Sequence, residues 1–148
     1  MTERITTTKN CDVDYLGPEL IDADVDRMST LGLAHVGDAV YELLARTWLA
    51  SHGRLTSRRL HNETVGIVRA PAQAMAARSL MEELTEDEAA VYRRGRNTRT
   101  NTIPKGAEAN EYHAATGLEA LFGWLYLKNR HERINELFGM IMEIEHAS

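Results

Sequence analysis

Two acidic residues stand among apolar neighbours in segments that have the composition of helices. Glu119 is the only carboxylate in TGLEALFGWLYL, residues 116–127. Asp38 lies in GLAHVGDAVYELLA, residues 32–45, where the only other acid is Glu42, one helical turn further on. Taking a carboxylate out of water costs several kcal/mol unless its charge is compensated. We therefore expect these two acids to have a compensating partner.

A divalent cation held between the two acids would provide that compensation. If their helices pack side by side, Asp38 and Glu119 could face each other, and the helix-interior glycines Gly37, Gly117 and Gly123 favour such an approach. Two bare carboxylates would repel each other, whereas Mg²⁺ is typically bound by one or two carboxylates, waters and a substrate phosphate. Mg²⁺ held there could polarise a phosphodiester and lower the pKa of an attacking water. The alternative is that each acid pairs with an arginine or a backbone amide, or lies at a surface edge.

Basic residues concentrate between the two acidic segments, in YRRGRNTRTNTIPK, residues 92–105. They are Arg93, Arg94, Arg96, Arg99 and Lys105. With Asn97 and the threonines between them, they suit phosphate and ribose oxygens, which position a nucleic acid without reading its sequence. Gly95 would let a bound backbone approach closely. The alternative is a solvated loop, but this segment leads directly into the helix of Glu119 and could guide a bound nucleic-acid backbone toward the acids.

The remaining pattern predicts an all-α domain whose helices position these residues. About six helices and no strand are expected after residue 29. They run from Ser29 or Thr30 to Gly53, Thr56 to Val68, Pro71 to Leu84, Thr85 to Gly95, around Glu119, and over residues 131–146. The first of these helices begins with an N-cap at Ser29 or Thr30 and ends at Gly53. The fourth begins with the capping box of Thr85 and Glu88 and ends at Gly95.

Length, charge and cysteine usage limit the class of protein. A chain of 148 residues fits one domain, which we place at residues 29–148 behind a partly disordered leader, residues 1–28. The single cysteine, Cys11, excludes an internal disulfide and a cysteine-based zinc site. No apolar run has the length of a membrane span, and the first residues lack a signal core, so a cytoplasmic protein without a membrane partner is expected. The net charge of −5 means that any anionic partner must meet a local basic patch.

Several separated segments, in order, resemble one enzyme family. LAHVGDAVYE, residues 33–42, resembles the signature helix of the ribonuclease III endonuclease domain, and TGLEALFGWLYL resembles its second acidic helix. The intervening LTEDEAAVYRRGRNTRTNTIPKGAEANEYHAATGLEA is similar to the mini-ribonucleases III, the branch without a double-stranded-RNA-binding domain. The resemblance covers residues from about Ser29 to Glu145.

This resemblance implies an all-α homodimer that cuts double-stranded RNA with Mg²⁺ and leaves 5′-phosphate and 3′-hydroxyl ends. It implies one long valley across the dimer, with an active site near each end. Asp38 falls on the family's metal-binding aspartate and Glu119 on its catalytic glutamate. By analogy with bacterial members of the branch, the expected substrate is the precursor of large-subunit (23S) ribosomal RNA, and a large-subunit ribosomal protein is a further candidate partner.

Two positions depart from the pattern of full-length ribonuclease III. Ala34 and Thr116 stand where that pattern has further acids, and the mini branch lacks both. Waters and Thr116 would then take the vacated positions around the metal, and the number of metal ions stays open. Glu42 would either contribute to the outer surroundings of the metal or form an ion pair on the solvent side.

The other polar residues near the acids receive simpler interpretations. His35 and His113 are expected to pack or to lie in the outer surroundings of the metal rather than to act as bases, because metal-bound water needs no histidine base. His61 and Gln73 are expected to be surface residues, with RNA contact as the alternative. Met75, Met81, Met140 and Met142 are expected to fill the core or a dimer contact.

Two other functions compete with the endonuclease. The missing acids favour a catalytically inactive module that binds structured ribosomal RNA. An all-α hydrolase for nucleotides or another small phosphorylated substrate is the second alternative, but the paired acidic clusters usual in such enzymes are missing from the sequence.

Overall fold

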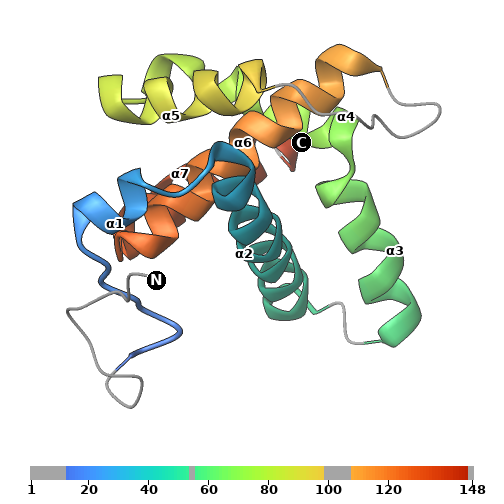
Figure 1. Ribbon diagram of the computed structural model, residues 1–148. Coiled ribbons are helices and arrows are strands. Elements are labelled where there is room, and N and C mark those ends of the chain that lie inside the picture. Colours follow the sequence, from blue (N-terminus) through green and yellow to red (C-terminus); the bar gives the residue numbers. More distant parts are fainter. Residues whose placement is uncertain (1–12, 54–55, 99–107, 147–148) are drawn as a thin grey trace.

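Helices make up the secondary structure of the computed structural model, which describes residues 13–53, 56–98 and 108–146 (Figure 1). Within these ranges no strand occurs, so the prediction of an all-α fold is confirmed. The helices are α1 (Asp22–Asp26), α2 (Thr30–Ser51), α3 (Ser57–Val68), α4 (Ala70–Leu80), α5 (Glu86–Asn97), α6 (Ala109–Leu127) and α7 (His131–Glu145), with a 3₁₀ turn at Met81–Glu83.

Helix α6 runs through the middle of the molecule, with α2, α4 and α5 packed against it (Figure 1). Every residue from Ala114 to Leu125 is buried except Glu119, because α6 has apolar or small side chains on almost every side. The prediction that this helix is largely buried is confirmed. Although α6 is so apolar, no helix in the described ranges has both the length and the hydropathy needed to cross a bilayer.

Glycines let α2 and α6 touch through their backbones. A Cβ atom at Gly37 would lie 1.6 Å from the carbonyl oxygen of Glu119, and one at Gly123 would lie 2.0 Å from the carbonyl oxygen of Leu33. No side chain could occupy either position at this helix spacing. The expected side-by-side packing of the two acidic helices is therefore confirmed.

Capping groups set the helix starts as expected. The Ser29 side chain accepts a hydrogen bond of 2.9 Å from the Gly32 amide at the start of α2. At the start of α5, Thr85 and Glu88 form both hydrogen bonds of a capping box. At the other end of α2, the chain leaves the helix through Gly53, which has a φ of 83°.

Helix α5 continues past Gly95 to Asn97, so the prediction that Gly95 ends it is wrong. A Cβ atom at position 95 would lie 2.7 Å from the Gly117 Cα and 3.1 Å from the Thr116 carbonyl oxygen. The glycine is needed because α5 crosses α6 at this point, in the last turn of α5. Gly95 is buried in this contact, which also corrects the expectation that it admits an RNA backbone.

The segment before α2 takes part in the packing. Val25 of α1 is 1% exposed and belongs to the core, and the Leu20 amide donates a hydrogen bond of 3.2 Å to the Leu127 carbonyl. Residues 1–12 lie outside the described residues, so the partly disordered leader stays a prediction.

The four methionines expected in the core or a dimer contact differ in burial. Met142 is buried and Met140 is partly buried against the core. Met75 and Met81 are 62% and 38% exposed, so neither is a core residue of this chain.

Candidate catalytic and cation-binding site

A cavity of about 420 Å³ is lined by residues of α2, α6 and the junction between α3 and α4. Its polar lining residues are His35, Asp38, Gln73, Tyr112, Thr116 and Glu119. Both acids that the sequence singled out therefore face the same cavity. The two acids come from helices that are distant in the chain, and they meet because the glycine contact holds α2 against α6.

Asp38 and Glu119 interact directly through their side chains. Burial raises the pKa of Glu119, and the hydrogen bond to Asp38 and the negative charge of Asp38 raise it further, to about 8. A hydrogen bond from Gln73 lowers this pKa but does not offset the other effects. In the absence of a cation, the carboxyl pair therefore retains a proton near neutral pH.

Asp38 lies on an exposed part of α2, and this corrects part of the sequence prediction. The two acids were expected to meet inside a buried helical contact, and they do meet. However, α2 buries against its neighbours only the face that carries residues such as Leu33, Gly37 and Tyr41. Asp38 follows at the edge of that face, so solvent and ligands reach the pair from its side.

Gln73 is a site residue whose role the sequence did not predict. It is 1% exposed, so the expectation of a surface position or an RNA contact is wrong. Its Nε2 donates hydrogen bonds of 2.8 Å to the Val68 carbonyl and 3.3 Å to Glu119 Oε2. Its Oε1 is buried and has no hydrogen-bond partner among the described residues, which costs about 1–3 kcal/mol if nothing else satisfies it.

A signal for this role was present in the sequence. Gln73 shares the buried face of α4 with Ala76, Ala77 and Leu80, at helical spacings of three, four and seven residues. A glutamine in an otherwise apolar stripe must find hydrogen-bond partners inside the protein. The spacing could therefore have indicated a buried amide at this position, although not its partner.

The donor set of the cavity fits a divalent cation. Burial, together with the hydrogen bond to Asp38 and like-charge repulsion, makes the carboxyl pair take up a proton, and a cation can take the place of that proton. The Thr116 hydroxyl donates to the Tyr112 carbonyl at 3.0 Å, so its oxygen lone pairs remain available to a water. No group of three or more His, Cys, Asp or Glu residues that could hold a metal occurs in the part of the chain that the structure describes. Asp38 and Glu119 would thus bind the ion together with waters and a substrate phosphate, as Mg²⁺ prefers.

The other candidates near the acids have separate roles. Glu42 forms an ion pair of 2.7 Å with Arg46 and does not line the cavity, which corresponds to the second of the two interpretations given for it. His35 lines the cavity from an exposed position on α2. His113 does not line the cavity, and its Nδ1 is buried.

Of the basic segment at residues 92–105, the structure describes the part that forms the C-terminal end of α5. Arg93, Arg94, Arg96 and Asn97 are exposed, and none of the three arginines forms an ion pair with another described residue. The Gly95 contact with the Thr116 carbonyl places this end of α5 beside the cavity wall. Arg99 and Lys105 lie outside the described residues.

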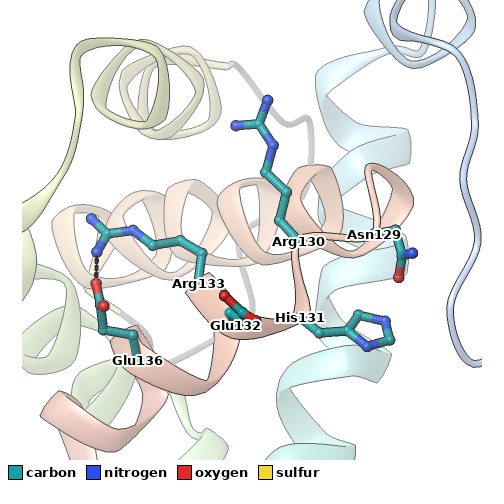
Figure 2. Close-up of a pocket in the computed structure, with 6 residues that line it drawn as sticks. All are labelled: Asn129, Arg130, His131, Glu132, Arg133 and Glu136. Atoms are coloured by element: carbon teal, nitrogen blue, oxygen red, sulfur yellow. Dashed lines mark hydrogen bonds and ion pairs between the residues drawn. The ribbon is translucent and has the colours of Figure 1, made fainter.

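A second cavity, of about 530 Å³, lies at the turn between α6 and α7 (Figure 2). Figure 2 shows Arg133 joined to Glu136 by an ion pair, with Arg130 pointing away from both. Arg133 also donates to Glu88 at 2.8 Å and to the Glu83 carbonyl at 2.6 Å. The Arg133 guanidinium links α7 to the start of α5 through these hydrogen bonds and is not free to bind a ligand. We therefore do not assign an active site to this cavity.

Comparison with known proteins gives the family. Residues 31–130, a range that includes both cavity acids, match the model of the family described as Ribonuclease III domain. The chain belongs to the ribonuclease III family. As a member of that family it is an endoribonuclease.

Relatives within the ribonuclease III family place the chain in its mini branch. A protein from Clostridium tetani named Mini-ribonuclease 3 is 39% identical over 135 residues, covering 90% of this chain and 89% of the relative. Another of that name from Symbiobacterium thermophilum is 45% identical over 107 residues, covering 72% of this chain and 82% of the relative. The resemblance to mini-ribonucleases III seen in the sequence is thereby confirmed.

A solved structure supports the same fold. The crystal structure of a protein from Fusobacterium nucleatum superposes with a TM-score of 0.74 at 29% sequence identity. The match covers 82% of this chain and 98% of that one. The helical arrangement that brings α2 against α6 thus belongs to a fold already observed by crystallography.

Proposed function

We propose that the protein is a Mg²⁺-dependent endonuclease that cleaves double-stranded RNA at the cavity between α2 and α6. The observation that carries this proposal is the direct interaction of Asp38 with Glu119 at a cavity reachable from solvent. A carboxyl pair of this kind does not stabilise the fold by itself, because burial and the mutual repulsion of the two acids both oppose its full ionisation. It becomes useful when a cation and a phosphate bind there.

The residues of the cavity divide the work of the reaction. Asp38 and Glu119 would hold the cation, with Glu119 fixed by Gln73 and Asp38 at the open side. When bound, Mg²⁺ supplies positive charge at the scissile phosphate and lowers the pKa of the attacking water. The Thr116 oxygen can accept a hydrogen bond from a water in the cavity. Cleavage in this manner would leave the 5′-phosphate and 3′-hydroxyl ends that the family resemblance implies.

The basic end of α5 supplies the affinity for RNA in this proposal. Arg93, Arg94, Arg96 and Asn97 are exposed around Gly95, whose backbone packs against Thr116 of the cavity wall. Arg99 and Lys105 are assigned the same role from the sequence. A-form RNA is recognised mainly through its shape, phosphates and 2′-hydroxyls, and arginine forks suit such contacts. A homodimer would bring two such sites to one duplex and cut both strands.

The biological substrate in this proposal is the precursor of 23S ribosomal RNA, processed in the cytoplasm. The support is the membership of the mini-ribonuclease III branch together with the family resemblance described above. A large-subunit ribosomal protein would act with the enzyme on this RNA.

Incubation of the purified protein with end-labelled duplex RNA, with Mg²⁺ or with EDTA, tests the proposal. The expected result is cleavage in Mg²⁺ only, with no cleavage of single-stranded RNA and no competition by free nucleotides. Retardation of the duplex on a gel without cleavage at any Mg²⁺ concentration would instead identify an RNA-binding module. Sedimentation of the same sample measures the oligomeric state, for which a dimer is expected.

A further inference from the structure

The Gln73 amide has only one orientation that satisfies its contacts. Its two hydrogen-bond partners are the Val68 carbonyl oxygen, which can only accept, and Glu119 Oε2, which accepts from the same amide. The atom that contacts them must therefore be the nitrogen, which uses both of its hydrogens. A flipped amide would place an oxygen against two other oxygens, which excludes the opposite orientation.

The anchor of this amide is the backbone at the junction between α3 and α4. Arg69 is at once the residue that ends α3 and the residue that precedes α4, so the two helices are joined without a loop. Val68 is the last residue of α3, and carbonyls at such a position lack a partner within the helix. Gln73 satisfies that carbonyl from the first turns of α4 and is thereby fixed in place.

The fixed amide then reaches a third element, because its second hydrogen contacts Glu119 on α6. The glutamate side chain has three rotatable bonds, and the negative charge of Asp38 repels it when both are ionised. A hydrogen bond to Glu119 Oε2 selects one of the available side-chain positions. The other carboxylate oxygen is left free of Gln73.

A neutral donor suits this task better than a charged one. An arginine or lysine at position 73 would also hold the carboxylate, but its positive charge would compete with a bound cation for the same two acids. An amide orients the carboxylate and leaves its negative charge uncompensated. Burial of Gln73 at 1% exposure also protects these hydrogen bonds from competition by water.

From these contacts we infer that Gln73 is the positioning residue of the site, an amide anchored on the end of α3 that sets the Glu119 carboxylate for cation binding. The inference deepens the proposed function and rests on it. Gln73 acts through Glu119 and has no contact with the RNA. Removal of the amide should therefore weaken cation binding and slow the reaction, without changing the affinity for the duplex.

The test compares Gln73→Met with Thr64→Val. Methionine is unbranched like glutamine, so it fills the space while removing both hydrogen bonds. Thr64 is buried on α3 and donates only to the Leu60 carbonyl of its own helix, so Thr64→Val is a matched removal of one buried polar group. Titration calorimetry of the RNA-free protein measures Mg²⁺ affinity, steady-state cleavage gives kcat and KM, and thermal unfolding reports the fold.

The expected result for Gln73→Met is a Mg²⁺ affinity and a kcat lower by about 10- to 100-fold, as for other groups that orient metal ligands. KM for the duplex should stay the same, and Thr64→Val should alter only the unfolding temperature. Gln73→Asn keeps an amide but has a side chain shorter by one methylene, so the amide no longer reaches Glu119 and the same reduction is expected. This variant replaces Gln73→Met in the test if the methionine variant fails to fold.

Different outcomes overturn different statements. Wild-type Mg²⁺ affinity and kcat in the Gln73 variants would overturn this inference and leave the proposed function intact. Absence of both Mg²⁺ binding and duplex cleavage in the wild-type protein would overturn the proposed function and the inference with it.

Discussion

Gly37 lies directly against the backbone of Glu119, where a Cβ atom on the glycine would fall 1.6 Å from the glutamate carbonyl oxygen. Asp38 is the next residue after this glycine. The contact that lets α2 and α6 touch therefore also determines how close the two carboxyl groups come. The spacing of the two helices and the geometry of the cavity have one origin.

Gly37→Ala should separate the helices and reduce both stability and activity. The added methyl group meets backbone atoms, which cannot turn aside as a side chain can. The expected fall in the free energy of unfolding is at least about 3 kcal/mol, the upper end of ordinary overpacking costs. Denaturant unfolding measures this change, and duplex cleavage by the remaining folded protein should be abolished.

Gly139→Ala is the matched control for that variant. Gly139 lies inside α7, and nothing would lie within 4 Å of its added Cβ atom. Alanine is the better helix former by up to about 1 kcal/mol, so this change should leave stability equal or higher. Equal stability of the two alanine variants would show that the α2–α6 contact is looser than described.

Asp38→Asn and Glu119→Gln should each reduce cleavage by at least about 100-fold, because each removes a charge that would hold the cation. Both amides are close in size to the acids, so the fold and the oligomeric state should be retained. Cleavage of labelled duplex RNA and circular dichroism measure the two properties. Glu143→Gln, at an exposed position on α7, is the control for removal of one acid. Full activity of either site variant would refute the assignment of the acids.

The sequence predicted the helices from α2 to α7 and the meeting of the two acids because these features depend on local or periodic signals, whereas α1 was not predicted. Ser29 and the Thr85 capping box mark helix starts through their own backbone hydrogen bonds. The surroundings of Glu119 are apolar on every side of its helix, which requires burial wherever the helix packs. Glycines inside two such helices then indicate that their backbones approach each other.

Features that depend on how helices cross could not be predicted in the same way. A glycine at position 95 is typical of a helix end, but the structure requires a glycine there because α5 crosses α6 at this point. Asp38 is exposed because α6 covers only one face of α2, and the helical spacing does not show where that face ends. Gln73 contacts Glu119 across 46 residues of sequence, through a junction whose angle no local pattern gives.

Replacing Arg94 and Arg96 by alanine should weaken duplex binding and flatten its dependence on salt. The slope of log affinity against log salt falls by about 0.9 for each phosphate that the protein no longer neutralises. Binding measured over a series of salt concentrations gives this slope. Arg130→Ala is the control, because Arg130 follows the C-terminal end of α6, away from the end of α5. Its guanidinium carbon lies 4.8 Å from the centroid of the Trp124 ring. Equal slopes for the double variant and the wild type would exclude the end of α5 as an RNA-binding surface.

Glu88→Gln should destabilise the fold without affecting the cavity. Burial alone would raise the pKa of Glu88, but hydrogen bonds from Arg133 and from the Thr85 amide outweigh it, and the pKa is lowered. Breaking a buried ion pair of this kind costs roughly 3 kcal/mol. Chemical unfolding of the variant measures this decrease, and Mg²⁺ affinity should match that of the wild type. Glu86→Gln, an exposed change in the same first turn, should cost less than about 0.5 kcal/mol. A decrease as large as that of Glu88→Gln would contradict the ion-pair explanation.

The stability of the cation-free protein should fall as pH rises through the neutral range. The pKa of Glu119 is raised from 4.5 to about 8, so the folded state keeps a proton that the unfolded state releases. Stability therefore decreases between these two values, by at most about 1.4 kcal/mol per pH unit, and levels off above the higher one. The charged group that faces Glu119 is Asp38, and His35 lines the same cavity. Unfolding of the wild type minus that of Glu119→Gln, measured in EDTA across this range, isolates the effect.

Binding of Mg²⁺ should displace the same proton. At about pH 7, each cation bound between Asp38 and Glu119 should release close to one proton, because its positive charge offsets both the burial and the repulsion that make the pair retain that proton. Above the raised pKa the release should vanish, since the pair is then already ionised. Titration calorimetry in two buffers of different ionisation enthalpy measures the number of protons directly. A heat of binding that does not depend on the buffer at about pH 7 would place the cation away from the carboxyl pair.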